Sequence, residues 1–339
     1  MLQLVRARWR FQRALRLWRA GRIAAALDHG GRAVTMFTAY AARRPDELVA
    51  ATLAMAGFRA ELADYPTAER LCEQALAVLD TQDNRPLRVD ALIRLGTVRR
   101  LRGDFDRAEE VLRTAVALAG RQPSDPALVA AAHNALGIVF KETGRYPAAA
   151  AEYEIALGLS GAAPAVHHNL AGLAYAEGRF DDAESWARRG LALREQAEST
   201  GIAADLTVLG AVLVALERHA EAEELLHRAL DVWTARFGPE HYEVSVCLHN
   251  LAALQQRRGE PDAALRSFQE ALRIREAALG TAHPELAVVL SNLAVLHEEQ
   301  RRPDHAAACR RRAQRLTREP QSSGARPAPP PPPGPPPAR

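Results

Sequence analysis

The sequence is poor in lysine, cysteine and aromatic residues, and it has no long apolar run. Lys141 is the only lysine, three residues are cysteine, and aromatic residues make up 5% of the 339 positions. Three cysteines cannot build a disulfide framework, and no two of them lie within metal-ligand spacing. No stretch approaches the roughly 18 apolar residues that a membrane-spanning helix needs, so the sequence predicts no transmembrane segment.

Apolar and charged residues are both plentiful, at 48% and 25%, and the net charge is only +3. This balance excludes wholesale disorder and a collagen-like chain. Because aromatic residues are few, the core must be built from Ala, Leu and Val, which favours closely packed helices. Arginines interrupt the N-terminal segment, so no signal peptide is expected. The bias toward Ala, Arg, Gly and Pro favours a bacterial protein, and the expected lack of a signal peptide favours a protein of the cytoplasm.

A pattern of small residues recurs along most of the chain. One repeat position is Ala in all of its copies: Ala26, Ala68, Ala108, Ala149, Ala183, Ala222, Ala264 and Ala306. A second position follows seven residues later: Ala33, Ala75, Ala115, Ala156, Gly190, Ala229, Ala271 and Ala313. Two antiparallel helices approach closely only where side chains are small, so both positions predict helix crossings.

Two further features complete the repeating unit. A large residue followed by a small one recurs in the preceding helix, as in Leu209-Gly210 and Leu251-Ala252, and we expect these pairs to be almost fully buried. A turn position separates the two helices: Gly21, Ala63, Gly103, Gly144, Gly178, Glu217, Gly259 and Arg301. Gly at this point predicts a helix C-cap with positive φ. One helical pair cannot bury its apolar face alone, so the copies must stack.

The unit resembles the tetratricopeptide repeat. The copy that contains Leu136-Gly137, Phe140, Ala149 and Tyr153, followed by Pro164, fits that family's pattern well. The resemblance covers about residues 3–318 and implies an all-α, right-handed superhelical solenoid of about eight helix-turn-helix repeats. The expected solenoid is 1–318, with repeats at about 3–36, 46–80, 86–120, 127–160, 164–197, 203–236, 245–278 and 287–318.

The last copies are longer than the usual 34 residues. Leu209, Leu251 and Leu293 occupy the same repeat position and lie 42 residues apart. The stretches that begin at Phe237 and Leu279 each continue with Gly and reach a His four residues on. This spacing is similar to the kinesin-light-chain-type variant, which is also common in bacterial proteins. It implies an architecture and not cargo transport.

The composition changes abruptly after about residue 318. Residues 319–339 are dominated by Pro and contain no core-forming residue. The sequence therefore predicts a disordered, extended Pro-rich tail that is dispensable for folding.

No catalytic motif is present in the sequence. There is no phosphate-binding loop, since Lys141 lies inside a repeat, and there is neither a zinc-protease helix nor a nucleophile elbow. His133 and His167 stand where the family pattern prefers Trp, so both are interpreted as packing residues. Cys72 falls at an apolar helix position and is expected to be a buried thiol. The sequence therefore predicts no enzyme, no metal site and no cofactor.

The best binding candidates are asparagines in the first helix of each pair. Asn169, Asn250 and Asn292 share one repeat position, and Asn134 is displaced from it by one residue. In the family, first helices line the concave wall, where an Asn amide can both donate to and accept from the backbone of an extended peptide. An alternative is that these side chains bond within the repeat. The polar residues expected on the same wall include Gln256, Arg257, Glu298, Lys141 and Tyr175.

The sequence therefore predicts a non-enzymatic scaffold that binds an extended peptide or protein segment on its concave face. The alternative is a regulatory or sensor module in bacterial signalling or transcription that holds a partner enzyme or a nucleic-acid-bound complex. Charge is uneven, because residues 1–22 hold seven Arg and no acid. Such an end could bind phosphate-rich partners or a membrane surface. A solvated Arg face is preferred, with Trp9, Phe11, Leu15 and Trp18 as packing residues of the first repeat. Nucleic acid is not the expected partner.

Overall fold

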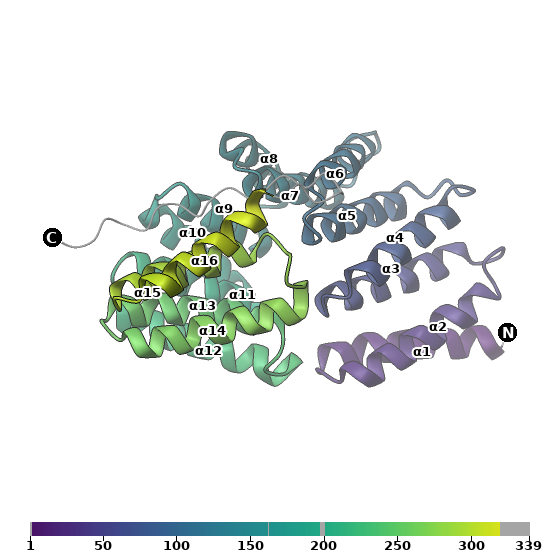
Figure 1. The fold of residues 1–339 in the computed structure, drawn as a ribbon. Coiled ribbons are helices and arrows are strands. Elements are labelled where there is room, and N and C mark those ends of the chain that lie inside the picture. Colours follow the sequence, from purple (N-terminus) through teal and green to yellow (C-terminus); the bar gives the residue numbers. More distant parts are fainter. Residues whose placement is uncertain (1, 162, 197–200, 319–339) are drawn as a thin grey trace. The chain divides into compact units, whose positions relative to one another are not determined.

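The computed structural model describes residues 2–161, 163–196 and 201–318, and these residues form sixteen α-helices and no strand (Figure 1). This confirms the all-α fold class and the helical-repeat solenoid. The Pro-rich tail expected at 319–339 lies outside the described residues.

The helices alternate between a first and a second member of each pair. The first helices are α1 (Leu2–Arg19), α3 (Pro45–Glu61), α5 (Arg85–Leu101), α7 (Pro126–Glu142), α9 (Pro164–Ala176), α11 (Ile202–Ala215), α13 (Tyr242–Arg257) and α15 (Leu286–Glu299). The second helices are α2 (Ile23–Thr38), α4 (Tyr65–Leu79), α6 (Phe105–Ala119), α8 (Tyr146–Ser160), α10 (Phe180–Gln196), α12 (His219–Phe237), α14 (Pro261–Leu279) and α16 (Pro303–Arg318).

Each pair is joined by the same tight turn. All eight turn residues adopt a positive φ, from 56° at Arg301 to 79° at Gly103, as the recurring Gly predicted. The residue after each turn donates its backbone N–H to the carbonyl five residues earlier, for example Asp104 to Arg99 at 2.9 Å and Arg302 to His297 at 2.8 Å. This six-to-one bond is the Schellman motif, which satisfies a helix C-terminal carbonyl and lets the next helix begin at once.

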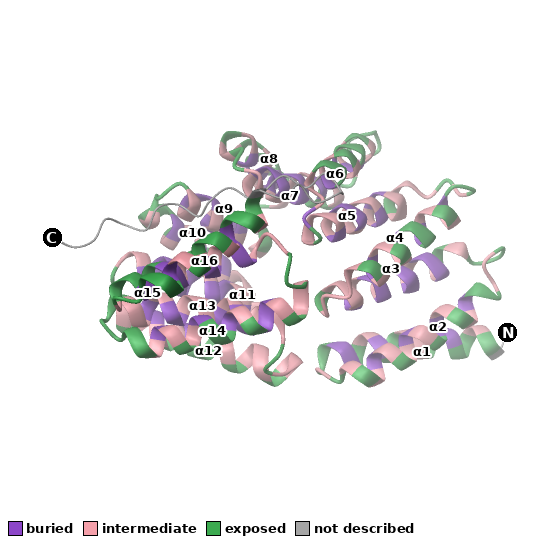
Figure 2. Ribbon diagram, viewed as in Figure 1, coloured by how far each residue is buried: buried purple, intermediate pink, exposed green. Residues whose placement is uncertain are grey.

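The small repeat positions form the helix crossings. All sixteen residues at the two positions are buried, and Figure 2 shows buried residues on the helix sides that face neighbouring helices. Leu209 is 0% exposed, Leu251 is 5% exposed, and Gly210 and Ala252 are buried, which confirms the expected burial of these pairs. A Cβ atom placed on Gly210 would lie 2.7 Å from the side chain of Leu226, so this crossing admits no larger residue.

The helices are organised in two compact units. The first unit holds the described residues up to Val139 together with Gly158–Ser160, and the second holds Phe140–Leu157 and the described residues from Gly161 onward. In the first unit α3 packs against both α4 and α5, and in the second α11 packs against α9, α12 and α13. The first helices α3 and α5 therefore contact each other in the first unit, and α11 contacts both α9 and α13 in the second.

The second helices of the 42-residue repeats are long. α12 and α14 each have 19 residues, and each is followed directly by a Gly with positive φ, Gly238 at 90° and Gly280 at 86°. His241 and His283 then accept a hydrogen bond at Nδ1 from the backbone N–H two residues on, at 3.3 Å in both cases. The assignment to the kinesin-light-chain-type variant stays a prediction.

Candidate binding face

The predicted binding residues do not all lie in one unit. Asn134 lies on α7 in the first unit. The other five lie in the second unit: Asn169 on α9, Asn250, Gln256 and Arg257 on α13, and Asn292 on α15. Only those five can be considered as one surface. We call the surface formed by α9, α11, α13 and α15 the first-helix face of the second unit.

Asn292 and Gln256 take part in a ladder of hydrogen bonds between α13 and α15. Tyr242 donates through its hydroxyl to Glu285 Oε2 at 2.5 Å. Seven residues further along α13, His249 Nε2 lies 3.3 Å from the Asn292 amide nitrogen, which donates to it. After another seven residues, the Gln256 side-chain amide donates to Glu299 Oε1 at 2.8 Å. The three rungs lie two helical turns apart, so they join two first helices along their length.

Burial accounts for the chemistry of this ladder. Burial and, to a smaller extent, the charge of Arg275 together lower the pKa of His249 to about 3, so the ring is neutral and can accept at Nε2. Burial also raises the pKa of Tyr242 well above its usual value, so its hydroxyl stays protonated and donates. Arg275, itself 7% exposed, donates through Nε to Ser245 Oγ at 3.2 Å.

Asn169 is largely withdrawn from the surface. Only 7% of the residue is exposed on α9. A bound chain would therefore find little of this side chain to contact.

Asn250 and Arg257 are the predicted residues that remain open to a ligand. They lie seven residues apart on α13, which places them on the same side of the helix. Asn250 is partly exposed and Arg257 is exposed. Among the residues that the structure describes, neither side chain has a hydrogen-bond or ion-pair partner. Both therefore keep their full bonding capacity for a ligand.

Side chains from neighbouring first helices extend this surface. Burial raises the pKa of Tyr175 on α9, and the charge of Arg257 acts on the same hydroxyl in the opposite direction, so the two groups lie near each other. The Lys141 Nζ atom lies 3.3 Å from the point where a Cβ on Gly172 would sit, one turn before Tyr175. Glu298 pairs with Arg310. The face thus combines a free amide, a free guanidinium, a phenol and an ammonium group.

A buried ionic cluster in the same unit was not predicted. Asp205 on α11 is 2% exposed, and its carboxylate lies 2.7 Å from His168 Nδ1 and contacts the guanidinium of Arg194. The cluster joins α9, α10 and α11. The sequence does contain a signal, because Asp205 is the only charged residue of α11, and a lone acid in an apolar helix must find buried partners.

His167 and Cys72, two of the residues interpreted as structural, are buried. His167 is 6% exposed, bonds the carbonyl of Ala163 through Nδ1 at 3.0 Å, and packs against the Trp186 ring with centroids 5.6 Å apart. Cys72 and Cys247 are fully buried free thiols, and burial raises their pKa to about 12 and about 11. Across the described part of the chain, no three His, Cys, Asp or Glu side chains are grouped to hold a metal ion.

Sequence comparison relates most of the chain to one family. A family profile described as Tetratricopeptide repeat matches residues 48–121, 201–277 and 257–319, and a second profile with the same description matches 134–198. No curated protein matches the sequence.

Three solved structures share the fold at low sequence identity. A Rap protein complexed with Competence and Sporulation Factor is 15% identical with a TM-score of 0.62, over 80% of this chain and 76% of that one. Aspartyl phosphate phosphatase F from Bacillus subtilis is 12% identical with a TM-score of 0.59, over 87% and 77%. The APC/C hetero-tetramer Cut9-Hcn1 is 14% identical with a TM-score of 0.65, over 90% and 52%. At these identities the likeness concerns the fold alone.

Proposed function

The chain belongs to the tetratricopeptide repeat family, whose members are protein-interaction scaffolds, and we propose that it binds an extended segment of a partner protein without catalysing a reaction. The proposed site is the first-helix face of the second unit. The observation that carries the proposal is the pair Asn250 and Arg257, which share one side of α13 and have no partner among the described residues.

The chemistry of this pair suits the backbone of an extended chain. Asn250 offers both a donor and an acceptor, which matches the alternating N–H and C=O groups of a peptide. Arg257 offers five N–H donors in a fork that fits a carbonyl or a carboxylate. Asn292 donates to His249 through its amide nitrogen, and its oxygen remains an acceptor for the same ligand. Modest contacts of about 0.5–1.5 kcal/mol each would add up along the segment.

Site-specific photo-crosslinking tests where the partner sits. A photo-reactive amino acid is placed at position 257 and, as the matched control, at position 266. Arg266 is also an exposed arginine without an ion-pair partner among the described residues, but it lies on the second helix α14. Cross-links from position 257 to one linear segment of a co-purified protein support the proposal. Equal or stronger cross-linking from position 266 contradicts it.

A further inference from the structure

The outer side of α1 carries a concentration of positive charge that the protein does not neutralise. The helix contains six arginines and no acidic residue. Arg8 alone is paired, with both oxygens of Glu47 at 2.6 and 2.7 Å. Within the described residues the other five have no carboxylate at ion-pair distance: Arg6, Arg10, Arg13, Arg16 and Arg19. Elsewhere in the chain, arginines commonly pair between repeats, as Arg99 does with Glu69 at 3.0 Å.

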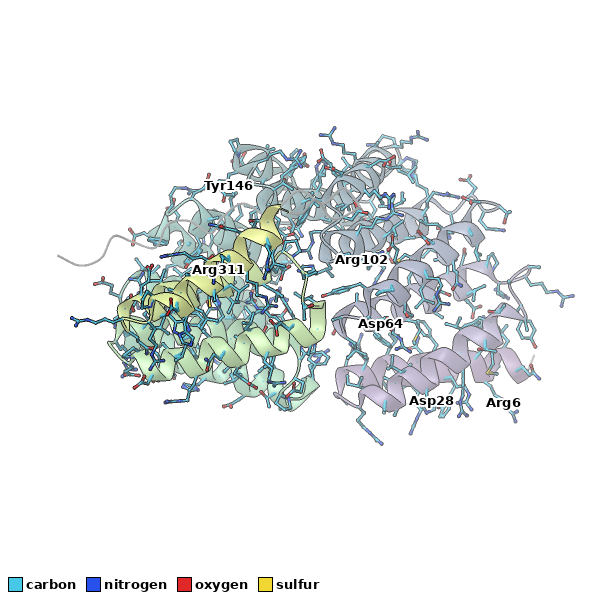
Figure 3. All side chains as sticks on the ribbon, viewed as in Figure 1. Arg6, Asp28, Asp64, Arg102, Tyr146 and Arg311 are labelled. Carbon is cyan, nitrogen blue, oxygen red and sulfur yellow. The ribbon has the colours of Figure 1, made fainter. Side chains whose placement is uncertain are left out.

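The same side of α1 exposes apolar surface. Val5 is 62% exposed and Trp9 is 54% exposed, and these are the two most exposed large apolar side chains of the described residues. They lie four residues apart and therefore share one side of the helix. The Arg13 guanidinium lies 5.3 Å from the centre of the Trp9 ring. Figure 3 shows Arg6 projecting away from the ribbon of this first helix pair.

The opposite side of α1 is firmly packed, so the outer side is a fixed surface. Ala7 and Ala14 are 0% exposed. Trp18 stacks on Phe58 of α3 with ring centroids 4.1 Å apart, and its indole N–H donates to Glu61 at 3.2 Å. The nearest carboxylate on α2, Asp28, already bonds Arg32 at 2.8 Å. The packed side of α1 therefore fixes the orientation of the helix, and its unpaired arginines stay on the surface.

We propose that this outer face, made of Val5, Trp9 and the four exposed unpaired arginines Arg6, Arg13, Arg16 and Arg19, docks α1 flat on an anionic lipid bilayer. Arginines reach lipid phosphates from the headgroup layer, and each contributes about five-fold to binding, the equivalent of about 1 kcal/mol. Trp9 and Val5 enter the boundary between headgroups and acyl chains. In the described part of the chain no helix is long and apolar enough to cross a membrane.

The apolar residues favour a bilayer over a nucleic acid. A phosphate backbone would neutralise the arginines, and a base could stack on Trp9. The exposed Val5 would then stay in water, because a nucleic-acid groove offers it no apolar phase. A bilayer surface supplies the phosphate layer and the apolar boundary along the length of one helix.

Vesicle sedimentation of the full chain tests the proposal. The probes are vesicles of phosphatidylcholine alone and of phosphatidylcholine mixed with phosphatidylglycerol. We expect binding to the mixed vesicles only, weakening as salt is raised. Arg13→Gln combined with Arg16→Gln should weaken binding roughly 25-fold, from two losses of about five-fold. Trp9→Ala should weaken it while circular dichroism stays unchanged.

The matched control removes the same charge elsewhere in the first unit. Arg70 and Arg121 are exposed and have no ion-pair partner among the described residues, so Arg70→Gln with Arg121→Gln should leave vesicle binding nearly unchanged. An equal loss in this control would show that net charge and not α1 is responsible, and it would overturn the proposal. Failure to bind mixed vesicles would overturn it too, as would binding a single-stranded oligonucleotide in preference to the vesicles.

Discussion

Three of the eight turn residues are not glycine, although their backbone adopts the left-handed conformation that glycine favours. Ala63, Glu217 and Arg301 have φ values of 57°, 60° and 56°. A residue with a Cβ is strained there by about 1–2 kcal/mol, because the Cβ crowds the next carbonyl. The fold accepts this strain because the turn must reverse the chain in one residue to keep each helix pair antiparallel.

Glu217→Gly should therefore stabilise the protein. Relief of strain exceeds the extra entropy of glycine in the unfolded chain, which leaves a net gain of about 0.5–1 kcal/mol. Gly259→Ala is the reverse change at an equivalent turn with φ of 74°, and it should destabilise by a similar amount. Urea denaturation of both variants measures the effect, and a lower midpoint for Glu217→Gly would refute the strain argument.

His249 should make the protein sensitive to acid. Burial lowers its pKa in the folded protein to about 3, whereas a histidine in the unfolded chain titrates near 6.5. Between these values the unfolded state binds the extra proton. Stability is therefore fully present above about pH 6.5 and falls as the pH is lowered toward 3, by up to about 1.4 kcal/mol per pH unit.

His249→Gln removes this titration while keeping an acceptor for Asn292. The variant should lose less stability between pH 7.5 and pH 5 than the unchanged chain does. Other histidines also have a lowered pKa, including His283 through burial, so part of the dependence remains. Chemical denaturation at the two pH values gives the comparison, and identical losses would mean that His249 is not the titrating group.

At the scale of helices, crossings depend on small residues at fixed positions. Ala222 is 0% exposed, and its carbonyl lies 3.6 Å from the point where a Cβ on Gly210 would sit. A larger side chain at Ala222 would have to push α11 and α12 apart. The same reasoning applies to Ala264 between α13 and α14.

Ala222→Leu should overpack this crossing and destabilise the protein by about 1–3 kcal/mol. Ala220→Leu on the outside of the same helix is the matched control, because Ala220 is exposed. Thermal unfolding monitored by circular dichroism should show a lower midpoint for the first variant only. An unchanged midpoint for Ala222→Leu would mean that the repeat register is wrong.

The helices, the turns and the helix crossings could be predicted from the sequence because they repeat along the chain. The positive φ at Glu217 follows from its alignment with Gly259, although Glu itself gives no such signal. The ladder between α13 and α15 could not be found in this way. Equivalent residues are 42 apart, but the bonded pairs are 43 apart, as in His249 with Asn292. Which residues pair between neighbouring repeats depends on how far one helix is shifted along the other. Aligning equivalent repeat positions does not give this shift.

For the same reason the asparagines proved unequal. Asn250 and Asn292 stand at equivalent positions, yet only Asn292 bonds a histidine on the preceding first helix. The residue 43 positions before Asn250 is Thr207, whose hydroxyl already donates to the carbonyl of Ala203 at 2.8 Å. Asn250 is therefore left without a partner among the described residues, and this difference makes it the better candidate for a ligand contact.

At the scale of the whole molecule, ion pairs between successive repeats accompany the packed core. Glu184 on α10 bonds Arg188 at 2.7 Å and Arg218 at 2.5 Å, and Arg188 also bonds Glu221 at 2.5 Å. Burial raises the pKa of Glu184, but the two arginines lower it by more. Exposed pairs of this kind contribute little individually, so stability comes mainly from stacked repeats. Asn250 and Arg257 differ from these paired side chains, because neither has a hydrogen-bond or ion-pair partner among the described residues.

The most direct test of the proposed binding face is a calorimetric titration with the partner segment identified by cross-linking. The double variant Asn250→Ala with Arg257→Ala is compared with the unchanged chain and with Arg266→Ala. Loss of two contacts worth about 0.5–1.5 kcal/mol each should weaken binding about ten-fold or more, with thermal stability unchanged. Full-strength binding by the folded double variant would contradict the account and place the partner on another surface.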